Sequence, residues 1–102
     1  MACEDLPINS STVVDTDHVS ILVANADGSF YAIENKCTHQ DTPLAQGRIR
    51  RGYVACPLHG VLFNLQTGEP QGQLTRKPVA TFPVHLENGR IQIDITDAVN
   101  AN

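Results

Sequence analysis

Two short segments contain the residues best suited to bind a metal. The first is Cys37-Thr38-His39 and the second is Cys56-Pro57-Leu58-His59, with 16 residues between them. We call them the first box (residues 37–39) and the second box (residues 56–59). Thiolates and imidazoles are the ligands of zinc sites and of some iron–sulfur clusters. If the two boxes form loop tips that face each other, they offer two sulfur and two nitrogen ligands to one metal centre.

Four interpretations of these residues compete. In the first, two buried thiols and two surface histidines have no common role, but two matched pairs are improbable by accident. The second is a Cys37–Cys56 disulfide, which is rare in a reducing compartment. The third is structural zinc, although its sites usually pair Cys with Cys and His with His at close spacing. The fourth is a [2Fe–2S] cluster with both cysteines on one iron and both histidines on the other.

The composition is that of one globular domain. Of the 102 residues, 41% are hydrophobic and 18% are charged; since one domain has about 100–150 residues, we expect a single domain over residues 1–102. Seven basic and 11 acidic residues give a net charge of −4. This charge argues against nucleic acid and anionic membranes as partners, because both require basic patches. It is compatible with a partner that offers a basic docking surface.

The sequence also indicates where the protein is located. The acidic start, residues 1–5, lacks the basic and apolar regions of a signal peptide. No apolar run approaches the roughly 18 residues of a membrane span, so we expect a cytoplasmic protein that does not enter a membrane. An odd number of cysteines, three, fits poorly with a disulfide scaffold.

The elements that must position the boxes are short strands. Residues 18–24 and 29–33 are predicted to pair across an Asp-Gly turn, and residues 79–86 and 90–95 across an Asn-Gly turn. In the second pair, alternation places Phe82, Val84 and Leu86 on one face, with Ile91, Ile93 and Ile95 in phase. We expect both hairpins to belong to one antiparallel base.

The region between the hairpins holds both boxes and most of the glycines. Residues 51–55 and 61–64 are predicted to form short strands within it. Residues 42–47 are predicted to form one helical turn, with Thr42 as the N-cap, Pro43 at the first helical position and Gly47 at its end. Ligand-bearing loops inserted into a β scaffold are a usual place for a functional site.

The two boxes and the sequence after them resemble the Rieske iron–sulfur family. The similarity extends over about residues 13–95, and its most specific part is the two-box motif itself. Further matching residues follow the boxes: Gly60, Phe63, Thr67-Gly68, Pro78-Val79 and Phe82-Pro83-Val84. The resemblance implies an all-β Rieske fold of antiparallel sheets, with a cluster-binding subdomain inserted at about residues 36–70.

The resemblance also implies the cofactor and its ligands. One Rieske-type [2Fe–2S] cluster is expected, with Cys37 and Cys56 on the inner iron. His39 and His59 bind the outer, solvent-facing iron through ring nitrogens. Two thiolates and two neutral imidazoles leave the oxidised cluster uncharged, whereas four thiolates make it doubly negative. An electron is therefore added more easily, which raises the potential above that of plant-type ferredoxins.

Within the family, the sequence is similar to the members of low potential. Rieske proteins of cytochrome complexes have an extra cysteine in each box, but here Leu58 occupies that position in the second box and Gln40-Asp41-Thr42 follow the first box. Cys3 is too far away to replace it and is expected to be incidental, near a loose terminus. High-potential members have Ser and Tyr hydroxyls that donate hydrogen bonds to the cluster sulfurs. The matching residues here are Val61 and Phe63, whose side chains cannot donate. We therefore predict the low end of the Rieske range, on the order of −150 mV.

The implied function is one-electron transfer without catalysis. The resemblance is to a stand-alone ferredoxin of a bacterial aromatic-ring-hydroxylating dioxygenase system. Such a ferredoxin takes electrons from a flavin-dependent NAD(P)H reductase and passes them to a terminal oxygenase with its own Rieske centre. Two alternatives remain: the small Rieske subunit of an NAD(P)H nitrite reductase, and a zinc-stabilised binding module.

Several other residues allow two interpretations each. In the resembling family a proline such as Pro57 shields the cluster, but a simple turn residue is the alternative. We expect Leu44, Leu58 and Leu62 either to cover the inner side of the cluster or to pack in the ordinary core. Positive φ angles are expected of Gly47, Gly60 and Gly68. A docking role or a solvated strand edge is expected of Arg48, Arg50 and Arg51. A solvated side chain is expected of His85, which like His18 lies outside the boxes.

Overall fold

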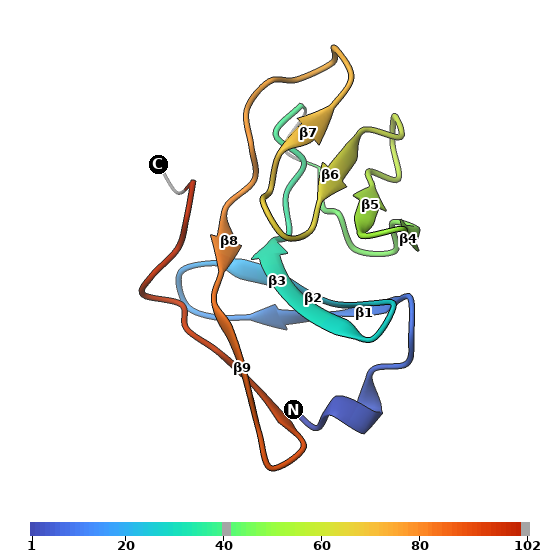
Figure 1. The fold of residues 1–102 in the computed structure, drawn as a ribbon. Helices are drawn as coiled ribbons and strands as arrows, with labels where there is room; N and C mark the ends of the chain where they lie inside the picture. Colours follow the sequence, from blue (N-terminus) through green and yellow to red (C-terminus); the bar gives the residue numbers. More distant parts are fainter. Residues whose placement is uncertain (40–41, 101–102) are drawn as a thin grey trace.

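The described part of the chain forms three antiparallel sheets (Figure 1). The computed structural model describes residues 1–39 and 42–100. The elements are η1 (Cys3–Asp5, a 3-10 helix), β1 (Ser10–Asp15), β2 (Ser20–Ala26), β3 (Ser29–Glu34), β4 (Ile49–Arg50), β5 (Tyr53–Ala55), β6 (Leu62–Asn64), β7 (Pro70–Gln71), β8 (Thr81–Phe82), β9 (Val84–Glu87) and β10 (Arg90–Ile93). The sheets have the strand orders β1-β2-β3-β8, β4-β5-β6-β7 and β10-β9. The predicted all-β fold is confirmed.

Strand β2 is buried on both of its faces, which agrees with its run of four apolar residues at 21–24. Its alternate side chains enter two separate cores: Leu22 and Ala24 enter one, and Ile21 and Val23 enter the other. Successive side chains of a strand point to opposite faces, so the β1-β2-β3-β8 sheet is a central layer. The first core also contains residues of β4–β6 and the cysteines of both boxes, whereas the second contains Ile91 of β10.

Both predicted hairpin turns are present. Asp27 and Gly28 have φ angles of 53° and 97° between β2 and β3, and Asn88 and Gly89 have φ angles of 53° and 73° between β9 and β10. Positive φ at both central residues is typical of the type I′ turns that match the twist of a two-stranded hairpin. The registers follow from these turns, with Ala26 opposite Ser29 and Glu87 opposite Arg90.

The expectation of one common base for both hairpins is wrong. β8 pairs with β3 in the central sheet, whereas β9 and β10 form a sheet of their own. Pro83 separates β8 from β9, and a proline has no N–H group with which to continue a sheet ladder. The expected apolar faces are also shorter than predicted, because Leu86 is 56% exposed and Ile95 is 44% exposed.

The expected helical turn at residues 42–47 is also wrong. This segment is a turn, in which the Gly47 N–H donates to the Leu44 carbonyl at 2.9 Å. The Ala45 N–H donates instead to the Asn35 side chain, and Gln46 has a positive φ of 69°. Contacts with the end of β3 thus override the local helix signals. Gly47, unlike Gly60 and Gly68, does not have the positive φ that we expected of it.

The N-terminal segment is paired rather than loose, contrary to expectation. Ala2 bridges Arg90, the Cys3 N–H donates to the Gly89 carbonyl at 2.8 Å, and Cys3 packs against the second core. This segment therefore covers one side of the β9–β10 hairpin.

No helix in residues 1–39 and 42–100 is long and apolar enough to cross a bilayer.

Candidate metal centre

The first box directly follows the end of β3, which fixes its position. The Glu34 N–H donates to the Ala80 carbonyl, and the Cys37 N–H donates to the Thr42 carbonyl at 2.6 Å. Cys37 is fully buried. The backbone thus folds back on itself around this cysteine and directs its thiol into the core.

The second box forms the loop between β5 and β6. The Cys56 N–H donates to the Val61 carbonyl and the Gly60 N–H donates to the Cys56 carbonyl, each at 2.8 Å. Gly60 has a φ of 74°, which glycine adopts without strain. These bonds close a tight loop, in which Cys56 is 3% exposed while His59 is solvent-exposed.

The structure brings the two boxes together through their histidines. The His39 and His59 rings have centroids 5.3 Å apart and planes at 72°, an edge-to-face arrangement. The two cysteines belong to the same core cluster, and neither forms a disulfide bond with another described residue. Because no disulfide joins Cys37 and Cys56, the disulfide interpretation is wrong. Gln40 and Asp41, where the sequence has no extra cysteine after the first box, lie outside the described residues.

One atom indicates that the site is built for a ligand. The Nδ1 atom of His39 is buried and has no hydrogen-bond partner among residues 1–39 and 42–100. A buried polar atom without a partner costs about 1–3 kcal/mol, and native proteins rarely contain one. A metal ion bound to this nitrogen removes that cost. The donor set of two thiols and two imidazoles therefore fits a [2Fe–2S] cluster of the Rieske type.

The spacing of the ligands also bears on the type of metal centre. In residues 1–39 and 42–100, no three His, Cys, Asp or Glu side chains gather as ligands of one metal ion. A tetrahedral zinc site needs three or four protein ligands around one ion. Each iron of a Rieske cluster takes only two ligands from the protein.

A third segment, which the sequence did not reveal, holds the first box in place. The Thr38 hydroxyl lies 2.6 Å from the Lys77 carbonyl, to which it donates, and 3.0 Å from the Thr75 hydroxyl. These two contacts join residues that are 37 and 39 positions apart in the chain, and no local sequence pattern marks either end of them. The loop between β7 and β8 thereby packs against the first box.

The side chains around the boxes divide into a buried and an exposed set. Val61 and Phe63 are 4% and 0% exposed and belong to the same core cluster as both cysteines, and neither carries a hydrogen-bond donor. Leu44 is fully buried in that cluster, but Leu58 is 54% exposed and Leu62 is 39% exposed. Pro57 is also exposed. Of the three leucines, only Leu44 is therefore buried in the core that contains both cysteines.

Comparisons with known proteins agree with this geometry. Residues 1–83 match the family described as the Rieske [2Fe-2S] domain. The 3-phenylpropionate/cinnamic acid dioxygenase ferredoxin subunits of Escherichia coli and Shigella flexneri are 37% identical over 95 residues, which is 92% of this chain and 89% of theirs.

Solved structures extend the similarity to the whole fold. The ferredoxin of carbazole 1,9a-dioxygenase from Nocardioides aromaticivorans superimposes with a TM-score of 0.85 at 27% identity, covering 91% of each chain. A complex of reduced oxygenase and oxidized ferredoxin in carbazole 1,9a-dioxygenase gives 0.86 at 28% identity, covering 91% of this chain and 96% of that one. A putative small subunit of a nitrite reductase gives 0.75 at 17% identity, which shows a shared fold only. The chain belongs to the Rieske [2Fe–2S] family, and it is a ferredoxin, an electron-transfer component with one Rieske cluster rather than a catalytic enzyme.

Proposed function

We propose that Cys37 and Cys56 bind the inner iron of the cluster and that His39 and His59 bind the outer iron. The observation that carries this assignment is the buried Nδ1 atom of His39, which has no hydrogen-bond partner among the described residues and belongs to a ring whose centroid lies 5.3 Å from that of His59. The depth of each residue agrees with its role, since both cysteines are buried and His59 is exposed. Residues 36–70 then act as the cluster-binding subdomain of a single domain.

The arrangement of the ligands suits electron transfer. When bound, a Rieske cluster can accept and release a single electron. The buried thiols exclude water from the inner side, and the exposed His59 ring provides a short path from the outer iron to a docked protein. A second protein can thus receive the electron without a substrate pocket on this chain.

We also propose the partners, from the similarity to dioxygenase ferredoxins. A flavin-dependent NAD(P)H reductase gives one electron at a time to the cluster. A terminal ring-hydroxylating oxygenase with its own Rieske centre receives it. This exchange takes place in the cytoplasm, where the NAD(P)H of the cell is available.

The metal content tests the ligand assignment. Protein purified without oxygen is expected to contain two irons and two inorganic sulfides per chain, with visible absorption bands that dithionite bleaches. A His39→Ala variant is expected to lose the bands, and a His85→Ala variant to keep them, because His85 is an exposed residue of β9. Colourless protein with one zinc per chain would exclude a cluster and leave the zinc-stabilised binding module.

Val61→Ser tests how the surroundings of the second box set the potential. Val61 is buried in the same core cluster as both cysteines, and its side chain has no hydrogen-bond donor. A hydroxyl there is expected to donate to a cluster sulfur and raise the potential by tens of millivolts, since such bonds stabilise the more negative reduced state. Potentiometric titration of the visible bands measures the shift. Val61→Ala is the control, because it opens the same space without a hydroxyl; an equal rise in both variants would mean that water entry is responsible.

A further inference from the structure

Charge is divided unevenly between the two halves of this molecule. Six of the seven Lys and Arg residues fall within residues 36–77, together with two acidic residues, which gives this segment a charge of +4. The rest of the chain has one basic and nine acidic residues and a charge of −8, which accounts for the total of −4. The net charge therefore hides a positive segment, and that segment contains both boxes.

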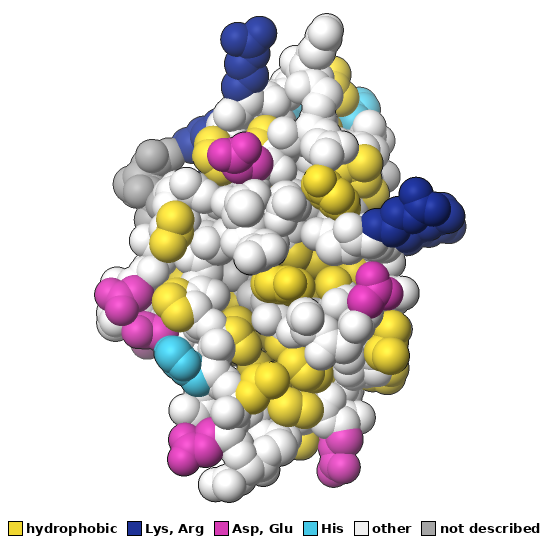
Figure 2. Space-filling model, viewed as in Figure 1, with side chains coloured by type: hydrophobic (Ala, Val, Ile, Leu, Met, Phe, Trp, Pro, Cys, Tyr) yellow, Lys and Arg dark blue, Asp and Glu magenta, His cyan; other side chains and the backbone are white. Residues whose placement is uncertain are grey.

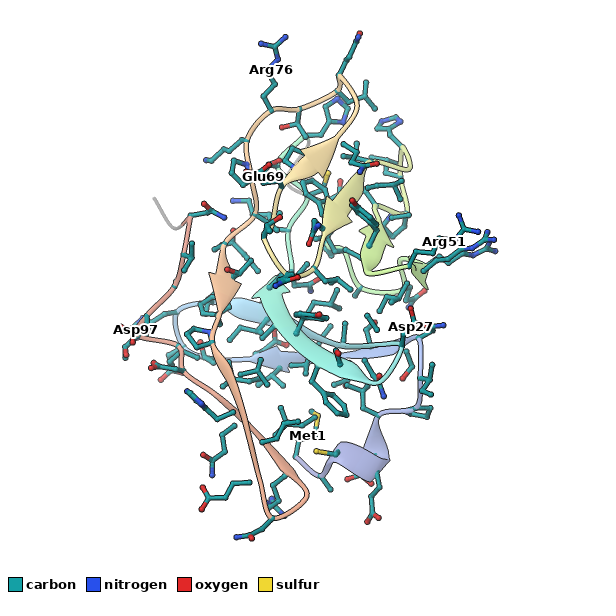
Figure 3. All side chains as sticks on the ribbon, viewed as in Figure 1. Met1, Asp27, Arg51, Glu69, Arg76 and Asp97 are labelled. Carbon is teal, nitrogen blue, oxygen red and sulfur yellow. The ribbon has the colours of Figure 1, made fainter. Side chains whose placement is uncertain are left out.

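The division in sequence is also a division in space. Figure 2 shows the Lys and Arg side chains gathered over the half that contains β4–β7, and most Asp and Glu side chains over the other half. Figure 3 places Arg76 and Arg51 in the first half, while Asp97 lies beside the other half. Glu69 is an exception in the positive half, and Asp27 lies just below Arg51 at the border between the halves. Thr96 donates side-chain and backbone hydrogen bonds to Asp94, which lower the pKa of this one carboxyl and favour its charged form.

Three of the arginines border a hollow on the outward face of the β4-β5-β6-β7 sheet. The hollow has a volume of about 500 Å³ and is lined by Arg48, Arg50, Arg51, Tyr53, Ala55, Leu62 and Gln71. Ala55, Leu62 and Gln71 lie opposite one another in register across three strands, which makes them a continuous floor. The opposite face carries the buried Val54 and Phe63. We call the lining residues the arginine face.

The arginine face adjoins the second box. Ala55 directly precedes Cys56, and Leu62 follows Val61, whose carbonyl accepts the Cys56 N–H. The exposed His59 and the 54% exposed Leu58 form the tip of the same hairpin. A protein that covers His59 therefore meets the arginine face as well.

We propose that the arginine face docks an acidic surface of the protein that receives the electron. Carboxylates of that surface pair with Arg48, Arg50 and Arg51, while an apolar side chain packs on Tyr53 and Leu62. The field at the docking site has the sign of the nearby charges, because salt screens charges beyond about 8–10 Å. The expected partner surface is therefore acidic, whereas the net charge of −4 suggested a basic one. This inference rests on the proposed electron-transfer function.

Small oxidants of opposite charge test the sign of the field where the electron leaves. Stopped-flow absorbance follows reduced protein mixed with ferric EDTA, an anion, or hexaammineruthenium(III), a cation; one electron passes to the metal complex and no proton or bond is exchanged. We expect the rate with the anion to fall with added salt and the rate with the cation to rise. Arg48→Glu is expected to slow the anion reaction about fourfold at low salt.

Arg90→Glu is the matched control, because Arg90 is exposed in β10 and its replacement changes the net charge equally. It is expected to leave the rate with ferric EDTA nearly unchanged. If both variants slow the reaction equally, or if salt accelerates the anion reaction, the net charge governs and the inference is wrong. If neither oxidant reacts with reduced protein, the proposed function itself fails, which is a distinct result.

Binding of an acidic polypeptide supplies a test without electron transfer. Adding poly-L-glutamate to oxidised protein is expected to shift the amide NMR signals of residues 48–53, and Arg48→Glu is expected to weaken this binding. Poly-L-lysine is expected to shift signals of the negative half instead. Shifts by poly-L-glutamate outside residues 36–77 would overturn the proposal, as would a dimer at low salt in analytical ultracentrifugation, which would make a second copy of the chain the occupant.

Discussion

His59→Cys is expected to lower the reduction potential of the assembled protein by on the order of 100 mV. A thiolate in place of a neutral imidazole adds one negative charge beside the outer iron, and a more negative centre accepts an electron less readily. Exchanging both histidines for cysteines corresponds to the difference between Rieske and plant-type centres, roughly 250 mV from the low end of the Rieske range. One exchange accounts for about half of that difference. Potentiometric titration of the visible bands measures it.

The same substitution at His39 is expected to have a larger effect. His39 is partly buried and its Nδ1 atom is fully enclosed, whereas His59 is exposed. Solvent screens a charge less at a buried position than at an exposed one. The potential of His39→Cys should therefore lie below that of His59→Cys.

A cysteine elsewhere on the surface controls for these two variants. His85→Cys places a thiol on an exposed position of β9 and is expected to leave the midpoint unchanged. An assembled His59→Cys protein whose midpoint equals that of His85→Cys would contradict the assignment of His59 as a ligand. A variant without visible bands reports on assembly alone, so the comparison uses protein with a full content of iron.

The sequence was a sufficient guide wherever structure depends on neighbouring residues. An Asp-Gly or Asn-Gly pair fixes a type I′ turn through its own φ angles, so both hairpins and their registers could be predicted. The two boxes could be found because their ligands are two and three residues apart. The motif also predicts that the boxes meet, and the 5.3 Å contact between the His39 and His59 rings agrees with this.

The predictions failed where distant residues decide the local structure. Residues 42–47 have the capping pattern of a helix, but the Ala45 N–H donates its hydrogen bond to the Asn35 side chain instead. Strands β4 and β7 have two residues each, too few to show a period of two. Thr38 contacts Lys77 across the fold, and the division of charge becomes a feature of the site only once residues 36–77 are folded together.

Gly47→Ala is expected to destabilise the protein by about 3–5 kcal/mol, in the range of the most damaging single substitutions. A methyl group on Gly47 would collide with the backbone carbonyl oxygen of Ala55 and lie 2.8 Å from that of Leu44. Both obstacles are backbone atoms, so relief requires the turn to move away from β5. Since Ala55 directly precedes Cys56, this movement also disturbs the second box. The midpoint of thermal bleaching of the visible bands is expected to fall by more than about 10 °C.

Gly28→Ala is the control that separates crowding from backbone strain. Gly28 has a φ of 97°, but a methyl group there has no atom within 4 Å. Its replacement is expected to cost only the strain of a left-handed alanine, about 1–2 kcal/mol. It should leave the iron content unchanged, whereas Gly47→Ala should lower it. If the two variants bleach at the same temperature with the same iron content, the close approach of residues 42–47 to β5 does not hold the second box in place.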